Sequence, residues 1–295
     1  MSARRLNGTW YVVPCVVFLL ILTLFPFLFT IFASLRDWYL PEGLGQFVWL
    51  RNYIDILRDG EFWRAVGVSL TFAVSALLAE HLLGFLLAFG ISRTMRLRGF
   101  LTVGFMLPMM LPPILVALIW RLMMNPTTGV LNYFLQAVGL PRSLWLHSPR
   151  TVVASLVLID VWQWTPFVML VLLGGINAIP KEFSEAMAID GADLRSELRH
   201  LILPLLKPFF AVTILLRFVF VFTTFDVIMA LTRGGPGGAS TTAYLQAYLT
   251  SFAYLKMGSG GAMSILIFLI TISVSTFLLR RVIGIRENRG SLGAY

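Results

Sequence analysis

Charged residues and reactive side chains are both scarce in this sequence. Asp, Glu, Lys and Arg make up 13% of its 295 residues, whereas soluble proteins average about 25%. The single cysteine, Cys15, excludes an intrachain disulfide and a cysteine-rich metal site. The three histidines, His81, His147 and His200, do not have the spacing of metal ligands. We therefore expect no metal site.

Sequence motifs for catalysis are also missing. No glycine-rich loop ends in Gly-Lys-Ser or Gly-Lys-Thr, and the glycine-rich stretch 234–238 has no lysine. We find no nucleophile elbow, zinc motif or convincingly spaced carboxylate pair. The sequence thus predicts that the chain is not an enzyme and carries no cofactor, so that any energy it uses comes from a partner.

Apolar residues, in contrast, are abundant. They make up 58% of the chain, and the mean hydropathy is +0.84. The net charge is +9, but Lys and Arg are scattered at the ends of apolar runs, as in membrane proteins, and do not cluster on one face. We expect an integral protein of the cell membrane with the lipid bilayer as a partner, and no nucleic acid.

The apolar runs predict an all-α membrane protein with six transmembrane helices in a single domain, residues 1–295. Each run reaches the roughly 20 residues that a bilayer requires. In the third run, Pro108 and Pro112-Pro113 predict a kinked or broken helix, which is tolerated where neighbours satisfy the freed carbonyls. In the second, Gly84 and Gly90 are predicted helix-packing positions. The spans are expected at about 12–35, 65–91, 100–122, 151–176, 205–231 and 259–279.

The positive charges predict the orientation. With the N-terminus inside, the inner segments hold 13 Lys and Arg residues, whereas nine are diluted over much longer outer loops. Inner loops of membrane proteins carry the excess of positive charge. We therefore expect both termini, and the loop between the fourth and fifth spans, to be cytoplasmic.

That loop, residues 181–203, is predicted to be a helix, a turn and a second helix. Between Lys181 and Lys207 the sequence has five acidic and four basic residues, which are too costly to bury in hydrocarbon. Residues 182–190 are good helix formers, Gly191 supplies the turn, and 193–201 are helical again. Such an element fits a docking role at the membrane surface.

The loop also resembles a known motif. Glu185-Ala186, with Gly191 six residues on and Leu203-Pro204 twelve residues later, is similar to the EAA loop of the permeases of binding-protein-dependent ABC importers. Met187 and Leu201 depart from that pattern, which usually has Ala and Ile there. The resemblance implies a type I importer-like fold in which short coupling helices dock on a cytoplasmic ATPase. It assigns that contact to six residues: Glu185, Ala186, Asp190, Gly191, Leu203 and Pro204.

Two outer loops extend the resemblance to the carbohydrate-uptake branch. Residues 49–53 followed by Phe62-Trp63 resemble the family's first outer loop, and 234–236 with Thr241 and Tyr248 resemble its last. The family works with a second permease, expected to be a different chain, an ATPase dimer that holds ATP and Mg, and an extracytoplasmic substrate-binding protein. The resemblance thus implies half of a pathway for a sugar or polyol.

Ionisable residues within the spans mark the candidate pathway. Asp160 and Arg217 both lie near the middle of their spans, where a charge costs about 2.5–3.5 kcal/mol to insert. At helical spacing they extend into two stripes that mix aromatic and hydrogen-bonding groups, as a sugar requires. We expect Asp160 and Arg217 to pair when no substrate is bound. The predicted substrate residues are Asp160, Gln163, Trp164 and Phe167 on one stripe, and Arg217, Val221 and Thr224 on the other.

Other interpretations stay open from the sequence. Asp160 and Arg217 can be a buried structural pair without ligand contact. Glu80-His81 is predicted to make an interhelical polar contact, and Asp226 is either a gate or reaches the interface. The chain could instead be an ion-gradient-driven secondary transporter with Asp160 as the coupling residue, although no inverted repeat is visible. A membrane assembly factor would not explain the stripe around Asp160.

Overall fold

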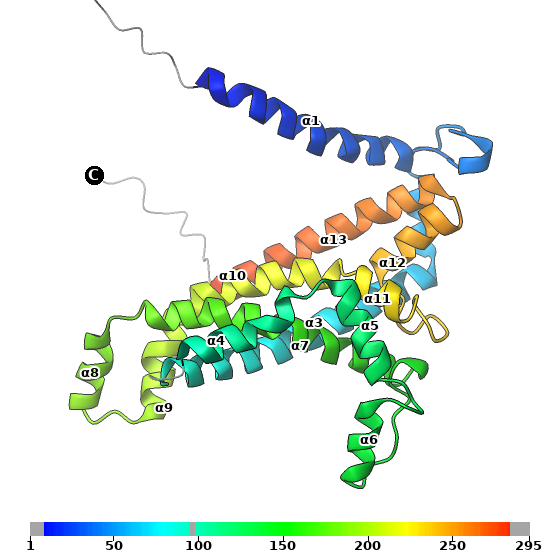
Figure 1. The fold of residues 1–295 in the computed structure, drawn as a ribbon. Coiled ribbons are helices and arrows are strands. Elements are labelled where there is room, and N and C mark those ends of the chain that lie inside the picture. Colours follow the sequence, from blue (N-terminus) through cyan, green and yellow to red (C-terminus); the bar gives the residue numbers. More distant parts are fainter. Residues whose placement is uncertain (1–8, 95–97, 284–295) are drawn as a thin grey trace, which may run out of the picture. The chain divides into compact units, whose positions relative to one another are not determined.

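The computed structural model describes residues 9–94 and 98–283, and most of these are helical (Figure 1). The long helices are α1 (Thr9–Ser34), α3 (Gly60–Ser92), α7 (Val152–Asn177), α10 (Leu203–Phe222) and α13 (Met257–Ile283). Shorter helices are α2 (Arg51–Arg58), α4 (Arg98–Met106), α5 (Pro113–Met123), α6 (Val130–Ala137), α8 (Lys181–Ile189), α9 (Leu194–Glu197), α11 (Asp226–Leu231) and α12 (Ala243–Tyr248). Five helical segments, or six with one bent pair, are long and apolar enough to cross a membrane. The predicted all-α membrane fold is confirmed.

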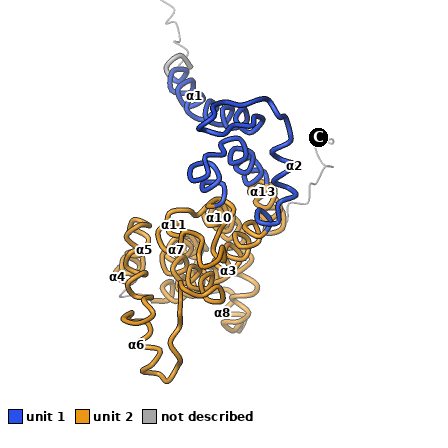
Figure 2. Tube along the Cα trace, turned by 90° about the vertical axis from the view of Figure 1, so that its right-hand side faces the viewer, with its two compact units in different colours: residues 1–63, 246–269 blue, residues 64–245, 270–295 orange. Residues whose placement is uncertain are grey.

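The helices form two compact units, residues 1–63 with 246–269 and residues 64–245 with 270–295 (Figure 2). In the first unit, the end of α1 is held by α2. The Asn52 side-chain amide donates to the carbonyls of Ser34 and Arg36, each at 2.8 Å, and Tyr53 Oη lies 2.6 Å from Ser34 Oγ. The Arg36 guanidinium lies over the Phe32 and Phe47 rings. Polar contacts thus order the turn that follows α1.

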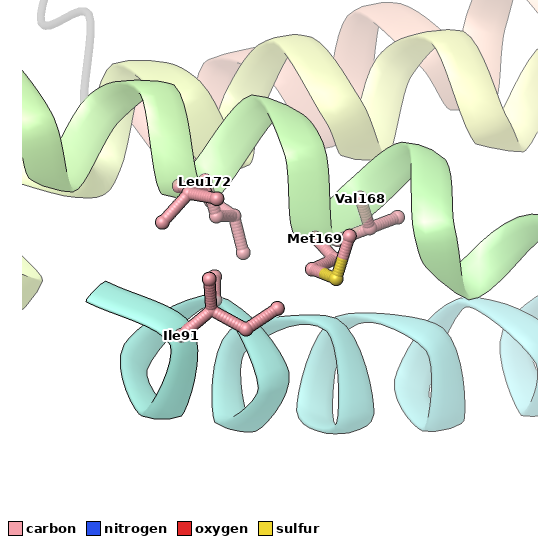
Figure 3. Close-up of a cluster of buried hydrophobic side chains, with 6 residues drawn as sticks. Ile91, Val168, Met169 and Leu172 are labelled. Atoms are coloured by element: carbon pink, nitrogen blue, oxygen red, sulfur yellow. The ribbon is translucent and has the colours of Figure 1, made fainter. Parts of the chain in front are cut away.

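An apolar cluster of the second unit lies between α3 and α7. Ala88 and Ile91 of α3 pack against Val168, Met169, Leu172 and Leu173 of α7, and Ile91 points toward α7 in Figure 3. In a membrane, such contacts gain stability from close packing, because lipid tails are as apolar as the side chains. A Cβ atom on Gly84 would lie only 2.9 Å from Val168 Cγ1. The packing role predicted for Gly84 is confirmed, whereas that for Gly90 is wrong, because Gly90 faces open space.

The third predicted span is a broken helix, as its prolines indicate. α4 continues into a 3-10 turn, Leu107–Met110, and α5 then starts at Pro113 at an angle of 92°. The break exposes the Leu111 carbonyl, which accepts a hydrogen bond from Gln163 Nε2 of α7 at 3.1 Å. A neighbouring helix thus satisfies the carbonyl that the prolines free.

The fifth predicted span, 205–231, is also interrupted. α10 ends at Phe222 and α11 begins at Asp226, so that residues 223–225 form a short non-helical link. The Thr223 and Thr224 hydroxyl groups donate to the carbonyls of Val219 and Phe220 within the last turn of α10. Threonine hydroxyls that bond back to carbonyls of their own helix weaken it slightly and often bend it, and here they accompany the break.

Candidate functional site

Three ionisable side chains from α3, α7 and α10 meet inside the second unit. Arg217 Nε and Nη2 donate to the two carboxylate oxygens of Glu80, at 2.8 Å and 2.5 Å. Arg217 Nη2 also donates to Asp160 Oδ2, at 2.6 Å. The residues are 2%, 0% and 8% exposed for Arg217, Glu80 and Asp160. The predicted pairing of Asp160 with Arg217 is confirmed, and Glu80 is the second partner.

The two carboxylates of this triad contact Arg217 unequally. The planar guanidinium fork matches a carboxylate with two parallel hydrogen bonds, and Glu80 takes that position. Asp160 has one hydrogen bond to the same Nη2 atom. The Arg217 guanidinium also lies 5.0 Å from the centre of the Trp164 ring, a favourable cation–π contact. Glu80 therefore fixes the orientation of Arg217, whereas Asp160 retains acceptor capacity.

His81 makes a separate contact between α3 and α10. One ring nitrogen lies 2.8 Å from the Leu77 carbonyl and Nε2 lies 3.0 Å from Thr213 Oγ1. The Thr213 hydroxyl is also within hydrogen-bond distance of carbonyls in its own helix. The interhelical polar contact predicted for Glu80-His81 is thus confirmed for both residues, and each joins α3 to α10.

A cavity of about 340 Å³ opens beside the triad. Its volume lies at the lower end of the range of small-molecule sites. Five of the predicted substrate residues line it: Asp160, Gln163, Trp164, Arg217 and Thr224. The two others do not. Phe167 packs against the core between α3 and α7, and Val221 is buried and does not line the cavity.

The cavity has further lining residues that sequence reasoning did not assign to it. Phe225 and Tyr244, whose ring centroids are 6.1 Å apart, contribute aromatic surface, and Asp226 adds a second carboxylate. No sequence signal placed Tyr244 here, because it lies beyond the break after α10. Glu80 could have been found, since it is the only carboxylate within its apolar run and Arg217 is a buried cation that requires neutralisation.

The 181–203 segment forms a second candidate site at the end of α7 that lies away from the cavity. α8 carries Glu185 and Ala186, and Asp190 caps its C-terminus. Gly191 follows with φ +74, a left-handed conformation that favours glycine. Asp193 Oδ1 then accepts from the Ser196 amide at 2.8 Å and caps α9.

The segment leads directly into the bundle. A π-helical turn, Leu198–Ile202, connects α9 to α10, which begins with Leu203 and Pro204. Proline is well suited to the first turn of a helix. Arg93, near the end of α3, pairs with Glu197 at 2.5 Å. The six residues of the predicted docking motif thus lie along one continuous helix–turn–helix, joined to both α3 and α10.

Groups of three or more metal-ligating side chains do not occur in the part of the chain that the structure describes. The triad combines two carboxylates with a guanidinium, which already occupies them. The side chains that line the cavity offer hydrogen bonding and ring stacking.

Comparisons with known proteins agree with this architecture. Residues 81–287 match the family described as binding-protein-dependent transport system inner membrane component. The trehalose/maltose transport system permease protein MalF of Thermococcus litoralis is 36% identical over 278 residues, which cover 92% of each chain. The probable starch degradation products transport system permease protein AmyD of Thermoanaerobacterium thermosulfurigenes is 30% identical over 274 residues, 91% of this chain and 92% of that protein.

A solved structure shares the fold over nearly the full length. It is a bacterial ABC transporter involved in the import of the acidic polysaccharide alginate, with a TM-score of 0.81 and 21% identity. The match covers 95% of this chain and 96% of that chain.

Proposed function

The chain belongs to the binding-protein-dependent transport system inner membrane components, and from this premise we propose that it forms half of the pathway of an ATP-driven sugar importer. As a permease, it is a multi-pass membrane subunit and not an enzyme. Its partners in this proposal are a second permease, expected to be a different chain, an ATPase dimer that binds ATP and Mg, and an extracytoplasmic binding protein. Both termini and the 181–203 segment then face the cytoplasm.

The observation that carries the proposal is the 181–203 helix–turn–helix. It presents apolar side chains to solvent among its charges: Phe183, Ile189 and Leu194 are all exposed. Exposed apolar groups rimmed by charges are typical of protein interaction sites. The ion pair between Glu197 and Arg93 and the connection into α10 give this surface two links to the helices around the cavity. Movement of a docked ATPase would therefore reach α3 and α10.

The cavity next to the triad supports an uncharged sugar as the transported solute. Trp164, Phe225 and Tyr244 offer aromatic faces for a sugar ring, and Gln163 and Thr224 add hydrogen-bonding groups. Among the described lining residues, Arg217 is the only cation, and both carboxylates of the triad already engage it. A further arginine, Arg233, lines an adjoining hollow together with Asp226. An acidic solute would thus meet unengaged negative charge at Asp226 but no free guanidinium within the cavity.

Two of the relatives support a sugar as the solute. They are named for the transport of trehalose and maltose and of starch degradation products, whereas the transporter that shares the fold at 21% identity imports an acidic polysaccharide. The alternative of an ion-gradient-driven carrier with Asp160 as the coupling residue is not favoured, because family membership and the exposed apolar groups of the 181–203 segment both support the proposed ATPase partner.

The proposal is tested by straining the turn of the 181–203 segment. At φ +74 with no atom within 4 Å of an added Cβ, valine at position 191 strains the backbone by about 1–3 kcal/mol without a clash. We expect Gly191→Val to reduce ATPase co-purification and ATP-dependent uptake of a neutral disaccharide by about tenfold or more, because a backbone strain of about 1.4 kcal/mol changes an equilibrium constant tenfold. Gly191→Asn should retain more function, because asparagine tolerates this conformation.

The matched control is Gly139→Val. Gly139 has φ +77 and an equally open environment, but it lies between α6 and α7. If both variants lost the ATPase equally, the effect would be one of folding and the proposed docking role would be refuted.

A further inference from the structure

The segment between α5 and α7 forms a projecting element, and none of its residues lines the cavity beside the triad. It lies at the end of α7 opposite the 181–203 segment. Within the second unit, α6 runs across the direction of α3 and α7 and extends away from them, in both views (Figures 1 and 2). If α3 and α7 cross the bilayer, α6 lies parallel to the membrane plane.

The segment is well ordered by hydrogen bonds. Asn132 is buried and uses its whole side chain: Nδ2 donates to the carbonyls of Pro126 and Ser143, at 2.9 Å and 3.0 Å. Its Oδ1 accepts from the Ser143 amide and from Trp145 Nε1. The Asn132 side chain therefore joins the chain before α6, at Pro126, to the chain after it, at Ser143. It thereby fixes which face of α6 points inward.

The opposite face of α6 is an exposed apolar stripe. Its members follow the i, i+3, i+4, i+7, i+8 pattern of an amphipathic helix, a pattern that normally faces a protein core. Here all of them are exposed, with Tyr133 at 69%, Phe134 at 60% and Val138 at 72%. The stripe consists of Val130, Tyr133, Phe134, Ala137 and Val138, and we call it the α6 stripe.

The charged side chains of the segment that carries the α6 stripe have one sign. From His81 to Ile159 the sequence has no Asp or Glu, and the segment from α5 to α7 carries Arg121, Arg142 and Arg150. The loop at residues 36–64 differs sharply, because its four arginines are accompanied by five carboxylates. A purely basic segment with exposed aromatic and aliphatic groups complements an anionic surface with an apolar interior.

We propose that α6 is an interfacial helix bound to anionic lipid headgroups of the leaflet opposite the 181–203 segment. The α6 stripe enters the boundary between headgroups and acyl chains, as the apolar face of an amphipathic interfacial helix does. Tyr133 lies at the depth where aromatic residues are enriched. Arg142, which is exposed and contacts Gln136 Oε1 at 3.3 Å, binds a lipid phosphate through its guanidinium fork.

The bilayer is favoured over a protein partner because both ends of the segment are tethered to membrane-spanning helices. Lipid is thus present beside the α6 stripe without any further chain. The position of α6 across the span direction also gives its apolar face a membrane surface to lie on. An anchored α6 would hold the start of α7, and with it the cavity residues, at a fixed depth.

The test measures the depth of α6 in liposomes. Cys15→Ser removes the native thiol, and single spin labels are then placed by Tyr133→Cys, Phe134→Cys and Val138→Cys in the full-length chain. We expect the labels to be more accessible to oxygen than to a water-soluble nickel chelate. The control is Asp55→Cys, at an exposed position within residues 36–64, the stretch with five carboxylates. This label should give the opposite result. Water-accessible labels on the α6 stripe would overturn the proposal, as would labels that become protected only when an extracytoplasmic binding protein is added.

Headgroup selectivity is tested by native mass spectrometry of the chain purified from mixed phosphatidylglycerol and phosphatidylcholine liposomes. Arg142→Gln should lower the ratio of retained phosphatidylglycerol to phosphatidylcholine about fivefold, the effect of one basic residue near an anionic surface. Arg58→Gln, at an exposed arginine within residues 36–64, should leave the ratio unchanged. An equal loss in both variants, or none in either, would overturn the assignment of anionic headgroups.

Discussion

The buried triad makes a quantitative prediction about stability. Arg217→Met removes the guanidinium and leaves Glu80 and Asp160, which are 0% and 8% exposed, without a cation. Removing one partner of a buried ion pair costs about 3–5 kcal/mol. Arg217 makes three charge-assisted hydrogen bonds and a contact with Trp164, so we expect the upper part of this range. Since about 1.4 kcal/mol is tenfold in an equilibrium constant, the equilibrium constant for folding would fall by roughly a thousandfold or more.

The remaining members of the triad should rank by their contacts. Glu80→Gln loses the bidentate acceptor and should cost more than Asp160→Asn, which gives up one hydrogen bond and leaves Arg217 bound to Glu80. Unfolding of the purified variants in detergent, followed by intrinsic fluorescence and far-UV circular dichroism, measures this order. If Asp160→Asn destabilised the chain as much as Arg217→Met, or if Arg217→Met had no effect, the unequal division within the triad would be refuted.

Asp160→Asn also separates structure from transport. Its effect on stability should be the smallest of the three, yet Asp160 lines the cavity whereas Glu80 does not. We therefore expect its uptake of a neutral sugar to change, in KM above all, because the lost carboxylate oxygen can accept from a sugar hydroxyl. Unchanged uptake kinetics would assign Asp160 to a structural role alone.

Two further predictions concern packing in each unit. Gly84→Ala should destabilise the contact of α3 with α7 by about 1–3 kcal/mol through overpacking, since its Cβ would meet Val168. Gly90→Ala, at an open position on the same helix, should be neutral or gain up to about 1 kcal/mol from helix propensity. Thermal unfolding of the two variants distinguishes them, and equal effects would contradict the close approach of Gly84 to Val168. Asn52→Leu removes two hydrogen bonds and leaves the Ser34 and Arg36 carbonyls without that donor, which costs about 1–3 kcal/mol. Its control, Asp55→Asn, breaks only an exposed ion pair with Arg51, which is worth about 0.5 kcal/mol. Hydrogen exchange at residues 34–37 should rise in Asn52→Leu and not in Asp55→Asn.

The helical membrane class could be predicted from the sequence because it depends on local quantities. A run of about 20 apolar residues requires a helix in lipid, whatever its neighbours are. The broken third span followed from Pro108 and Pro112-Pro113 for the same reason, since a proline acts on its own turn of helix. The break after α10 was missed, because threonines that donate to their own helix weaken it only slightly and often remain helical.

The 181–203 segment was accessible from the sequence to a similar degree. Its charges exclude it from the membrane, Gly191 marks the turn, and Pro204 marks the start of the next helix. All three signals lie within a few residues of the feature that they produce. The role of this segment in docking an ATPase still rests on the family and on the exposed apolar groups, and it stays a proposal.

The position of Asp160 and Arg217 within apolar runs of the sequence was enough to nominate them, because a charge in such a run requires a partner. Only the tertiary structure decided that Glu80 is the bidentate partner, that Gln163 satisfies the Leu111 carbonyl, and that Phe167 packs in the core while Tyr244 lines the cavity. These outcomes depend on how helices distant in sequence are rotated and shifted against each other. Side-chain packing between helices fixes that rotation, and no single stretch of sequence contains it.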